Sequence, residues 1–224
     1  MIVWIPKLLD SAEVRRITDA LAGARYRPGK ATAGILARGA KHNEEIDPNS
    51  IDKAALDSIV TGALQRNQTV EAAARLARIV PPIYSRYGVG DTYGSHLDNA
   101  TMGRLDARIR IDLSMTLFLS DPASYDGGEL AIDTEYGTKS FKLAPGDAAI
   151  YPTIYYHEVK PVTRGVRLAC VTWMQSLVRD PQRRQMLYDM AVLAEWLHAQ
   201  APGSPQFRQF NKIQHNLYRM WAED

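Results

Sequence analysis

The stretch Arg108–Leu119, RIRIDLSMTLFL, alternates aliphatic side chains with charged, hydroxyl-bearing or aromatic ones. A period of two indicates a β-strand, because successive side chains of a strand point to opposite faces of the sheet. The apolar face consists of Ile109, Ile111, Leu113, Met115, Leu117 and Leu119. We expect this face to be buried. The opposite face, which carries Ser114 and Thr116, can line a pocket if the strand belongs to a barrel of two sheets.

The same period extends from residue 79 to residue 173 and is broken at short intervals by turn residues. Asp126-Gly127-Gly128-Glu129 predicts a turn, Tyr136-Gly137 a hairpin tip, and Pro145-Gly146-Asp147 a tight corner. Short antiparallel strands joined in this way are typical of a jelly roll, or double-stranded β-helix, rather than of a sandwich with long strands. The sequence therefore predicts an α+β fold with a mainly β core.

Helical patterns precede this β region. Asp10 with Glu13 three residues later is the pattern of a capping box, and further helices are predicted over 51–64 and 69–77. The stretch 31–45 is small, polar and glycine-containing, which favours a loop that can act either as a lid over a pocket or as an ordinary surface loop.

Helical patterns also follow the β region. Asp180-Pro181 predicts a helix start, the helix runs to about Ala199, and a second helix follows Pro205. The apolar stripe of these helices, which includes Trp196 and Trp221, is expected to pack on the barrel or, in a homo-oligomer, on a second subunit. The predicted division is an N-terminal helical support region (1–78), a β core (79–177) and a C-terminal helical extension (178–224).

Composition limits the class of protein. With 224 residues the chain is long enough for one domain with a substantial core and a small appendage. Its 27 Lys and Arg residues and 25 Asp and Glu residues leave a net charge of +2, so nothing favours nucleic acid as a partner. The N-terminus lacks a signal-peptide pattern, no apolar run approaches a membrane span, and the single cysteine, Cys170, cannot form an internal disulfide. A cytoplasmic protein with a small-molecule or protein partner is expected.

Three side chains have the chemistry of a metal site. His96 and Asp98 are separated by one residue, so in an extended segment both point to the same face, and His157 follows where a returning strand can bring it alongside. Two imidazoles and one carboxylate occupy one face of a six-coordinate ion and leave three positions open, as in non-haem Fe(II) oxygenases. A structural site would instead be closed by four protein ligands. His42, His198 and His215 have no partner at such spacing.

Arg167 indicates a bound anion. Alternation in the segment 165–173 places it on one face with Ala169, Val171 and Trp173. An arginine on such a face is costly to bury unless an anion pairs with it, and a guanidinium can bind one carboxylate of a dicarboxylate whose other end chelates a metal.

With these residues the chain resembles the bacterial PKHD-type hydroxylases, relatives of the prolyl and lysyl 4-hydroxylases. The similarity extends over essentially the whole chain. It is carried by Asp91-Thr92-Tyr93-Gly94, by Asp112-Leu113-Ser114 with residues 116–122, by Ser124 to Leu130, and by Pro161 to Arg167.

The resemblance implies that His96, Asp98 and His157 bind Fe(II) and that Arg167 binds the co-substrate 2-oxoglutarate. It also implies that Tyr87 contacts the co-substrate and that Trp173 lies on the pocket wall, although both are equally compatible with ordinary core positions. Phe118 is a departure, because some relatives have a tyrosine there, so one hydrogen bond to the distal carboxylate is either absent or supplied by Thr116. Ascorbate is implied as a reductant, and a link to bacterial iron uptake is implied for the family.

The expected function is an Fe(II)- and 2-oxoglutarate-dependent dioxygenase that hydroxylates a C–H bond of an unidentified substrate and releases succinate and CO2. The substrate, a small molecule or a peptidyl residue, would reach the metal past Tyr93 and Asn99. Two alternatives use the same ligands. One is a non-catalytic iron or 2-oxoglutarate sensor that signals through its C-terminal helices, and the other is a zinc hydrolase with Glu158 as base, which would leave Arg167 without a purpose.

Overall fold

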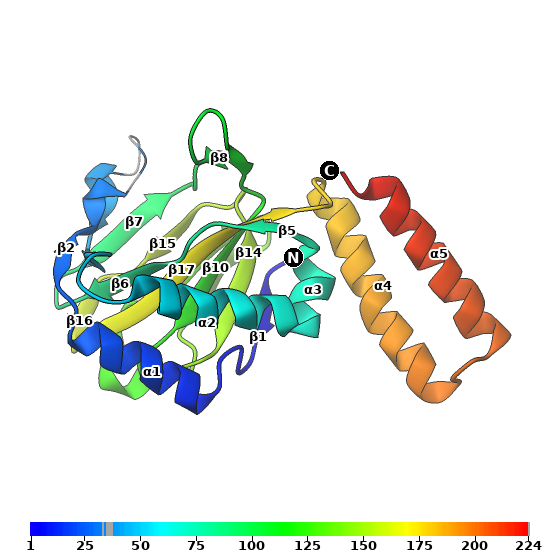
Figure 1. Ribbon diagram of the computed structural model, residues 1–224, viewed down its shortest axis with the longest axis horizontal. Helices are drawn as coiled ribbons and strands as arrows, with labels where there is room; N and C mark the ends of the chain where they lie inside the picture. Colours follow the sequence, from blue (N-terminus) through cyan, green and yellow to red (C-terminus); the bar gives the residue numbers. More distant parts are fainter. Residues whose placement is uncertain (33, 35–37, 224) are drawn as a thin grey trace.

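The core of the protein is a barrel of two antiparallel sheets, shown by a computed structural model that describes residues 1–32, 34 and 38–223 (Figure 1). The major sheet has the order β1-β14-β10-β17-β6-β4-β2, and β5 pairs with β17 beside this path. Its strands are β1 (Val3–Ile5), β14 (Ala148–Pro152), β10 (Leu113–Phe118), β17 (Arg167–Ser176), β6 (Ile83–Tyr87), β4 (Glu44–Ile46), β2 (Tyr26–Pro28) and β5 (Leu76–Ile79).

The minor sheet has the order β13-β12-β15-β7-β3. Its strands are β13 (Gly137–Phe141), β12 (Leu130–Thr134), β15 (His157–Val159), β7 (Thr92–His96) and β3 (Lys41–His42). Two short ribbons complete the β structure: β11 (Asp126–Gly127) with β16 (Val162–Arg164), and β8 (Thr101–Met102) with β9 (Ile109–Arg110). This arrangement confirms the predicted jelly roll with a mainly β core.

The two faces of the stretch 108–119 lie in different environments, as its alternation predicts. Leu113, Met115 and Leu117 are buried in the core that the helices cover. Ser114 and Thr116 point the other way, into the space between the sheets, where they line a cavity. The prediction of one continuous strand is wrong, because β9 and β10 are separated at residues 111–112.

The helices α1 (Ser11–Ala22), α2 (Lys53–Arg66) and α3 (Gln68–Ala74) contribute their buried side to the same core. Figure 1 shows α1 and α2 lying across the major sheet. The predicted capping box at the start of α1 is confirmed: the Asp10 carboxylate accepts from the backbone N–H of Glu13, and the Glu13 side chain accepts from that of Asp10. Burying one leucine or isoleucine side chain of this layer stabilises the fold by about 1.5–3 kcal/mol.

The N-terminal part of the chain supplies strands as well as helices. The predicted N-terminal helices are present, and strands that the sequence did not predict accompany them: β1, β2 and β4 extend the major sheet, and β3 extends the minor one. The stretch 31–45 is not a loop throughout, because it contains the 3-10 helix η2 (Arg38–Ala40), β3 and the start of β4, and it takes in the end of η1 (Gly29–Ala31). The part of the proposed lid at 33 and 35–37 lies outside the described residues. The domain boundaries at 78 and 178 stay a prediction.

The C-terminal extension is a helical hairpin of α4 (Pro181–Gln200) and α5 (Pro205–Trp221) beside the barrel (Figure 1). Asp180 and Ser204 cap the two helices, each followed by proline at the first helical position, as expected for the first of them. α4 packs against α3, whereas no residue of α5 is fully buried. Among the described residues no helix is long and apolar enough to cross a bilayer.

Candidate functional site

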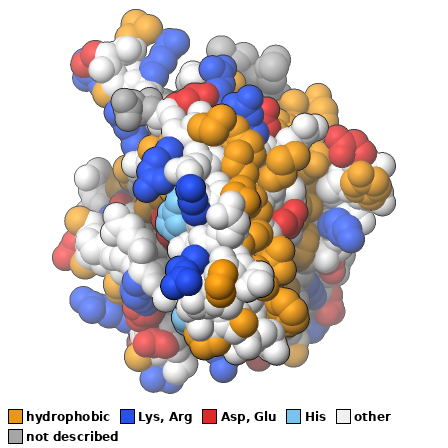
Figure 2. Space-filling view, turned by 90° about the vertical axis from the view of Figure 1, so that its right-hand side faces the viewer, with side chains coloured by type: hydrophobic (Ala, Val, Ile, Leu, Met, Phe, Trp, Pro, Cys, Tyr) orange, Lys and Arg blue, Asp and Glu red, His pale blue; other side chains and the backbone are white. Residues whose placement is uncertain are grey.

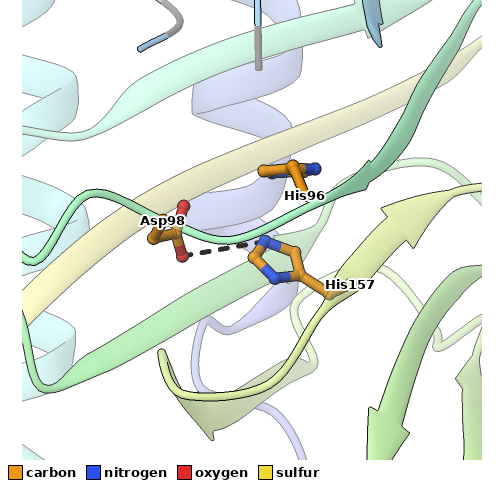
Figure 3. A group of neighbouring side chains, drawn as sticks. All are labelled: His96, Asp98 and His157. Carbon is orange, nitrogen blue, oxygen red and sulfur yellow. Dashed lines mark ion pairs between the residues drawn. The ribbon is translucent and has the colours of Figure 1, made fainter. Parts of the chain in front are cut away.

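His96, Asp98 and His157 converge at one end of the barrel. His96 is the last residue of β7, His157 is the first of β15, and the two are direct partners in the antiparallel register. Each of the three residues offers a ligand atom, and these atoms lie within 4.8 Å of one another. Figure 3 shows the three side chains pointing toward one another, with His157 Nε2 3.7 Å from Asp98 Oδ2. The separation is suited to a shared metal ion.

Neighbouring groups orient each of these side chains. His96 Nδ1 lies 2.8 Å from the Gly94 carbonyl oxygen, and His157 Nδ1 lies 3.2 Å from that of Tyr155. If each Nδ1–H donates to its carbonyl, each Nε2 keeps its lone pair for a metal. The Ser114 hydroxyl donates to Asp98 Oδ2 at 2.5 Å, which holds the carboxylate toward the imidazoles.

The protonation state of His96 also suits a metal ligand. Burial and, to a lesser extent, the neighbouring His157 lower its pKa to about 4, against the opposing effects of the Gly94 carbonyl and Asp98. The imidazole is therefore neutral at neutral pH, which is the form that binds a metal. The Tyr93 ring stacks on it with ring centroids 3.6 Å apart and planes inclined by 14°.

A cavity of about 660 Å³ surrounds the three side chains. Its wall comes from both sheets and includes Ser114 and Thr116 of β10 and Trp173 of β17. Tyr87 also lines it. The strand face that the sequence predicts to line a pocket does so.

Arg167 is the first residue of β17 and is only 1% exposed. Within the described part of the chain, its Nε and Nη2 have no hydrogen-bond partner. Its guanidinium carbon lies 5.0 Å from the centre of the Tyr87 ring and 5.7 Å from that of Phe118. A buried guanidinium between two rings, with donors unused, is expensive unless an anion accepts from it.

Of the other residues selected from the sequence, Tyr87 and Phe118 lie beside this arginine and Trp173 lies away from it. Tyr87 is 3% exposed and is the register partner of Arg167, and burial raises its pKa to about 12, so its hydroxyl is protonated. Trp173 lies at the opposite end of the pocket, paired with Ser114, and its indole Nε1 has no partner among the described residues. Phe118 presents a ring to Arg167 and no hydroxyl, so any second donor there must come from another residue.

Sequence reasoning missed several groups beside the site. Ser114 was assigned to the pocket face without a role, although it holds Asp98. Lys41, Asn43 and Glu45 are buried in the stretch expected to be a loop, and only the strand pairing of β3 and β4 reveals their position. The metal-capable group found among the described residues does not include His42, His198 or His215.

Comparisons with known proteins place this geometry in a family. Residues 82–175 match the model of the 2OG-Fe(II) oxygenase superfamily, and residues 181–223 match that of the PKHD-type hydroxylase C-terminal domain. The chain is 42% identical over 222 residues to a PKHD-type hydroxylase of Hyphomonas neptunium, covering 99% of both chains. It is also 42% identical over 225 residues to a PKHD-type hydroxylase of Pseudomonas putida, covering 100% of both.

Solved structures share the fold at low sequence identity. A prolyl-4-hydroxylase of Pseudomonas putida is 20% identical with a TM-score of 0.53, covering 78% of this chain and 92% of that one. A prolyl hydroxylase of Trichoplax adhaerens, in complex with a hypoxia inducible factor peptide, is 16% identical with a TM-score of 0.56, covering 83% and 86%. HygX of Streptomyces hygroscopicus, with nickel and 2-oxoglutarate bound, is 14% identical with a TM-score of 0.53, covering 78% and 82%.

These likenesses to solved structures support the jelly roll, while the near-complete match to the curated relatives and the two family models support the chemistry. The chain belongs to the PKHD-type hydroxylase family within the 2OG-Fe(II) oxygenase superfamily, and it is an oxygenase enzyme.

Proposed function

We propose that the protein hydroxylates a C–H bond of a substrate in a reaction that depends on Fe(II) and 2-oxoglutarate, with His96, Asp98 and His157 as the iron ligands. The observation that carries this assignment is the convergence of two imidazoles and one carboxylate within 4.8 Å of one another in a cavity. The facial set leaves three coordination positions for a chelating co-substrate and oxygen.

The residues around the triad fit the co-substrate. The unpartnered Nε and Nη2 of Arg167 are the kind of donors that bind a carboxylate in a bidentate, charge-assisted contact. Tyr87 connects Arg167 with the cavity around the metal-capable group, because it lines that cavity and is the strand-register partner of Arg167. We therefore assign the distal carboxylate of 2-oxoglutarate to Arg167, with Tyr87 as a further contact and Trp173 and Thr116 on the wall.

With iron and 2-oxoglutarate bound, such a site supplies oxidative decarboxylation to succinate and CO2, coupled to hydroxylation of the substrate. The protein's own residues then bind, orient and exclude water. Arg167 neutralises the distal carboxylate, Ser114 and the backbone carbonyls of Gly94 and Tyr155 fix the ligand side chains, and the apolar wall keeps bulk water out.

The finer features of this proposal rest on the sequence. Ascorbate is expected as the reductant that restores ferrous iron, and the substrate remains a small molecule or a peptidyl residue that passes Tyr93 and Asn99. A cytoplasmic location stays a prediction. Homo-oligomerisation through the C-terminal helices is likewise proposed.

The zinc hydrolase alternative requires Glu158 as a base at the metal. Glu158 follows His157 directly in β15, so the two side chains point to opposite faces of the strand. The Glu158 carboxylate instead pairs with Lys160 at 2.6 Å. The geometry therefore favours the oxygenase. The sensor alternative shares every ligand and differs in one measurable property, the release of succinate.

Conversion of 2-oxoglutarate to succinate in the presence of ferrous iron tests the proposal. Asp98→Ala removes a ligand and is expected to abolish succinate release, whereas Glu158→Ala should leave it unchanged.

Arg167→Ala should weaken 2-oxoglutarate binding while iron binding persists. Full turnover by Asp98→Ala would contradict the ligand assignment, loss of activity in Glu158→Ala would favour the hydrolase, and a wild type that binds both ligands without producing succinate would favour the sensor.

A further inference from the structure

Asn43 occupies the point where the chain passes from one sheet to the other. His42 ends β3, which pairs with β7 in the minor sheet, and Glu44 begins β4, which pairs with β6 in the major sheet. The Asn43 residue is only 6% exposed. A polar side chain is thus buried at a junction that closes one side of the barrel.

The strand register places Asn43 beside the proposed co-substrate contacts. Glu45 pairs with Ser85 and Glu44 with Arg86, so one further step brings Asn43 opposite Tyr87. Tyr87 in turn pairs with Arg167 on its other side. Because alternate residues of a strand share a face, Asn43 lies on the same buried face as Glu45. Asn43, Tyr87 and Arg167 therefore form one row across the interior of the major sheet.

The Asn43 amide has no partner of its own. Neither Oδ1 nor Nδ2 makes a hydrogen bond within the part of the chain that the structure describes. Gly29 packs closely against it, since a Cβ on Gly29 would lie 2.0 Å from Asn43 Oδ1, and the Gly29 N–H donates to the Asn43 carbonyl at 2.8 Å. An unsatisfied buried polar group costs about 1–3 kcal/mol, and an apolar side chain of the same shape would avoid that cost.

The Tyr87 hydroxyl is the group that can use this amide. Burial raises the pKa of Tyr87 to about 12, and Arg167 and the Asn43 side chain both act in the opposite direction, as expected of groups close to its oxygen. A phenol has one O–H to donate and lone pairs that accept. An N–H from Asn43 would fill the accepting side and leave the O–H free for a ligand.

We propose that Asn43 is a positioning residue, which holds the Tyr87 hydroxyl so that it donates to a carboxylate of 2-oxoglutarate bound at Arg167. The inference rests on the proposed function. When the co-substrate is bound, Asn43 Nδ2 would donate to Tyr87 Oη and the Tyr87 O–H would donate to the co-substrate, and each bond of such a chain polarises and strengthens the next. Asn43 and Tyr87 together would supply a second donor to the carboxylate bound at Arg167, which Phe118 cannot provide because it has no hydroxyl.

A double-mutant cycle on co-substrate affinity tests the proposal without knowledge of the substrate. The variants are Asn43→Leu, which keeps the shape of the side chain, Tyr87→Phe, and the two combined. 2-Oxoglutarate is titrated anaerobically into each Mn(II)-loaded protein by calorimetry. We expect Tyr87→Phe to weaken binding about tenfold, the value of one hydrogen bond to a charged group. Asn43→Leu should weaken binding by up to the same factor, because a misplaced hydroxyl loses that bond. The combined variant should bind within about twofold of Tyr87→Phe, because Asn43 acts only through that hydroxyl.

Three further measurements exclude a merely structural effect. The ligand-free Asn43→Leu protein should unfold at the same temperature as the wild type or higher, since it loses an unsatisfied amide. Asn43→Ala, which introduces no new atoms beside Gly29, should show the same coupling to Tyr87→Phe. Asn216→Leu on the exposed side of α5 is the matched control and should leave affinity unchanged.

The outcomes separate this inference from the function on which it rests. Three results would overturn the positioning role while the wild type still binds 2-oxoglutarate. They are unchanged affinity in both Asn43 variants, losses of affinity that multiply in the combined variant, and unchanged affinity in Tyr87→Phe. A wild type that does not bind 2-oxoglutarate at all would instead contradict the proposed function.

Discussion

Lys41 and Glu45 form an ion pair inside the protein, with side chains that are 6% and 2% exposed. Lys41 Nζ lies 2.5 Å from Glu45 Oε1, and the Thr32 hydroxyl lies within hydrogen-bond distance of both charged groups. Removing two charges from water is costly, so each partner is tolerated only because the other is present. The pair ties β3 to β4, next to the candidate site.

Replacing one partner of this pair should lower the free energy of unfolding far more than replacing both partners together. We expect Lys41→Met to lower the free energy of unfolding by about 3–5 kcal/mol, since it leaves the Glu45 carboxylate buried and unpaired. Lys41→Met combined with Glu45→Leu should recover most of that loss. Urea unfolding followed by fluorescence measures both values. Additive losses in the combined variant would show that the two charges do not depend on each other.

At the scale of single residues, what the sequence could predict depended on spacing. His96, Asp98, His157 and Arg167 were selected from local patterns, and the structure brings the first three together and buries the fourth. Asn43 could not be selected in this way, because its importance arises from a crossing between two sheets. Strand pairing over more than forty residues in sequence creates that environment, and no local period encodes it.

Among the elements, the turn that enters β17 is fixed by the absence of a side chain. Gly165 has φ of 73°, and a Cβ there would lie 2.2 Å from the Ser124 carbonyl oxygen. Gly203, in the turn between α4 and α5, has nearly the same φ of 72° but nothing within 4 Å of its Cβ position. The two glycines therefore separate the effect of backbone conformation from that of a collision.

Alanine at these two positions should have unequal effects. Gly203→Ala is expected to cost about 1–2 kcal/mol for the left-handed conformation alone. Gly165→Ala should cost about 2–5 kcal/mol, because a steric clash with backbone adds to that strain. It should also weaken 2-oxoglutarate binding, since Arg167 lies two residues further along. Equal losses of stability in denaturant titrations of the two variants would show that the contact with Ser124 is unimportant.

Prediction of the elements succeeded where a period was long and failed where strands were short. The alternation of 108–119 predicted the buried strand but not the break before β10. The break lies at Asp112, whose carboxylate accepts from Arg110 Nε and from the backbone N–H of Ser176. A tertiary contact of this kind leaves the alternation intact. The strands β2, β3 and β4 have two or three residues each, too few to show any period.

For the whole molecule, the hairpin of α4 and α5 presents apolar side chains that the barrel does not cover. Figure 2, a view from the side of the hairpin, shows a column of hydrophobic side chains with Lys and Arg beside it. Val192, Leu193 and Trp196 of α4 are 53%, 44% and 58% exposed. Contiguous apolar surface of this kind is typical of an interface between proteins.

Self-association through this surface is therefore the expected behaviour of the protein in solution. Leu193→Glu combined with Trp196→Glu should convert an oligomer into a monomer, because each carboxylate would lose its hydration in the contact. Analytical ultracentrifugation at several protein concentrations measures the change. Val89→Glu, on an exposed residue of the barrel, is the control. A wild-type protein that stays monomeric at every concentration would contradict the prediction.

The anchoring of the three metal-capable side chains links the supply of metal to the stability of the fold. Two of them belong to the minor sheet, and the third is held by Ser114 of the major sheet. A single ion bound to all three would cross-link the two halves of the barrel, and at a hundred times its dissociation constant it would raise the free energy of unfolding by about 2.7 kcal/mol. Iron starvation would then reduce the quantity of intact enzyme that survives proteolysis, in addition to silencing each molecule that remains.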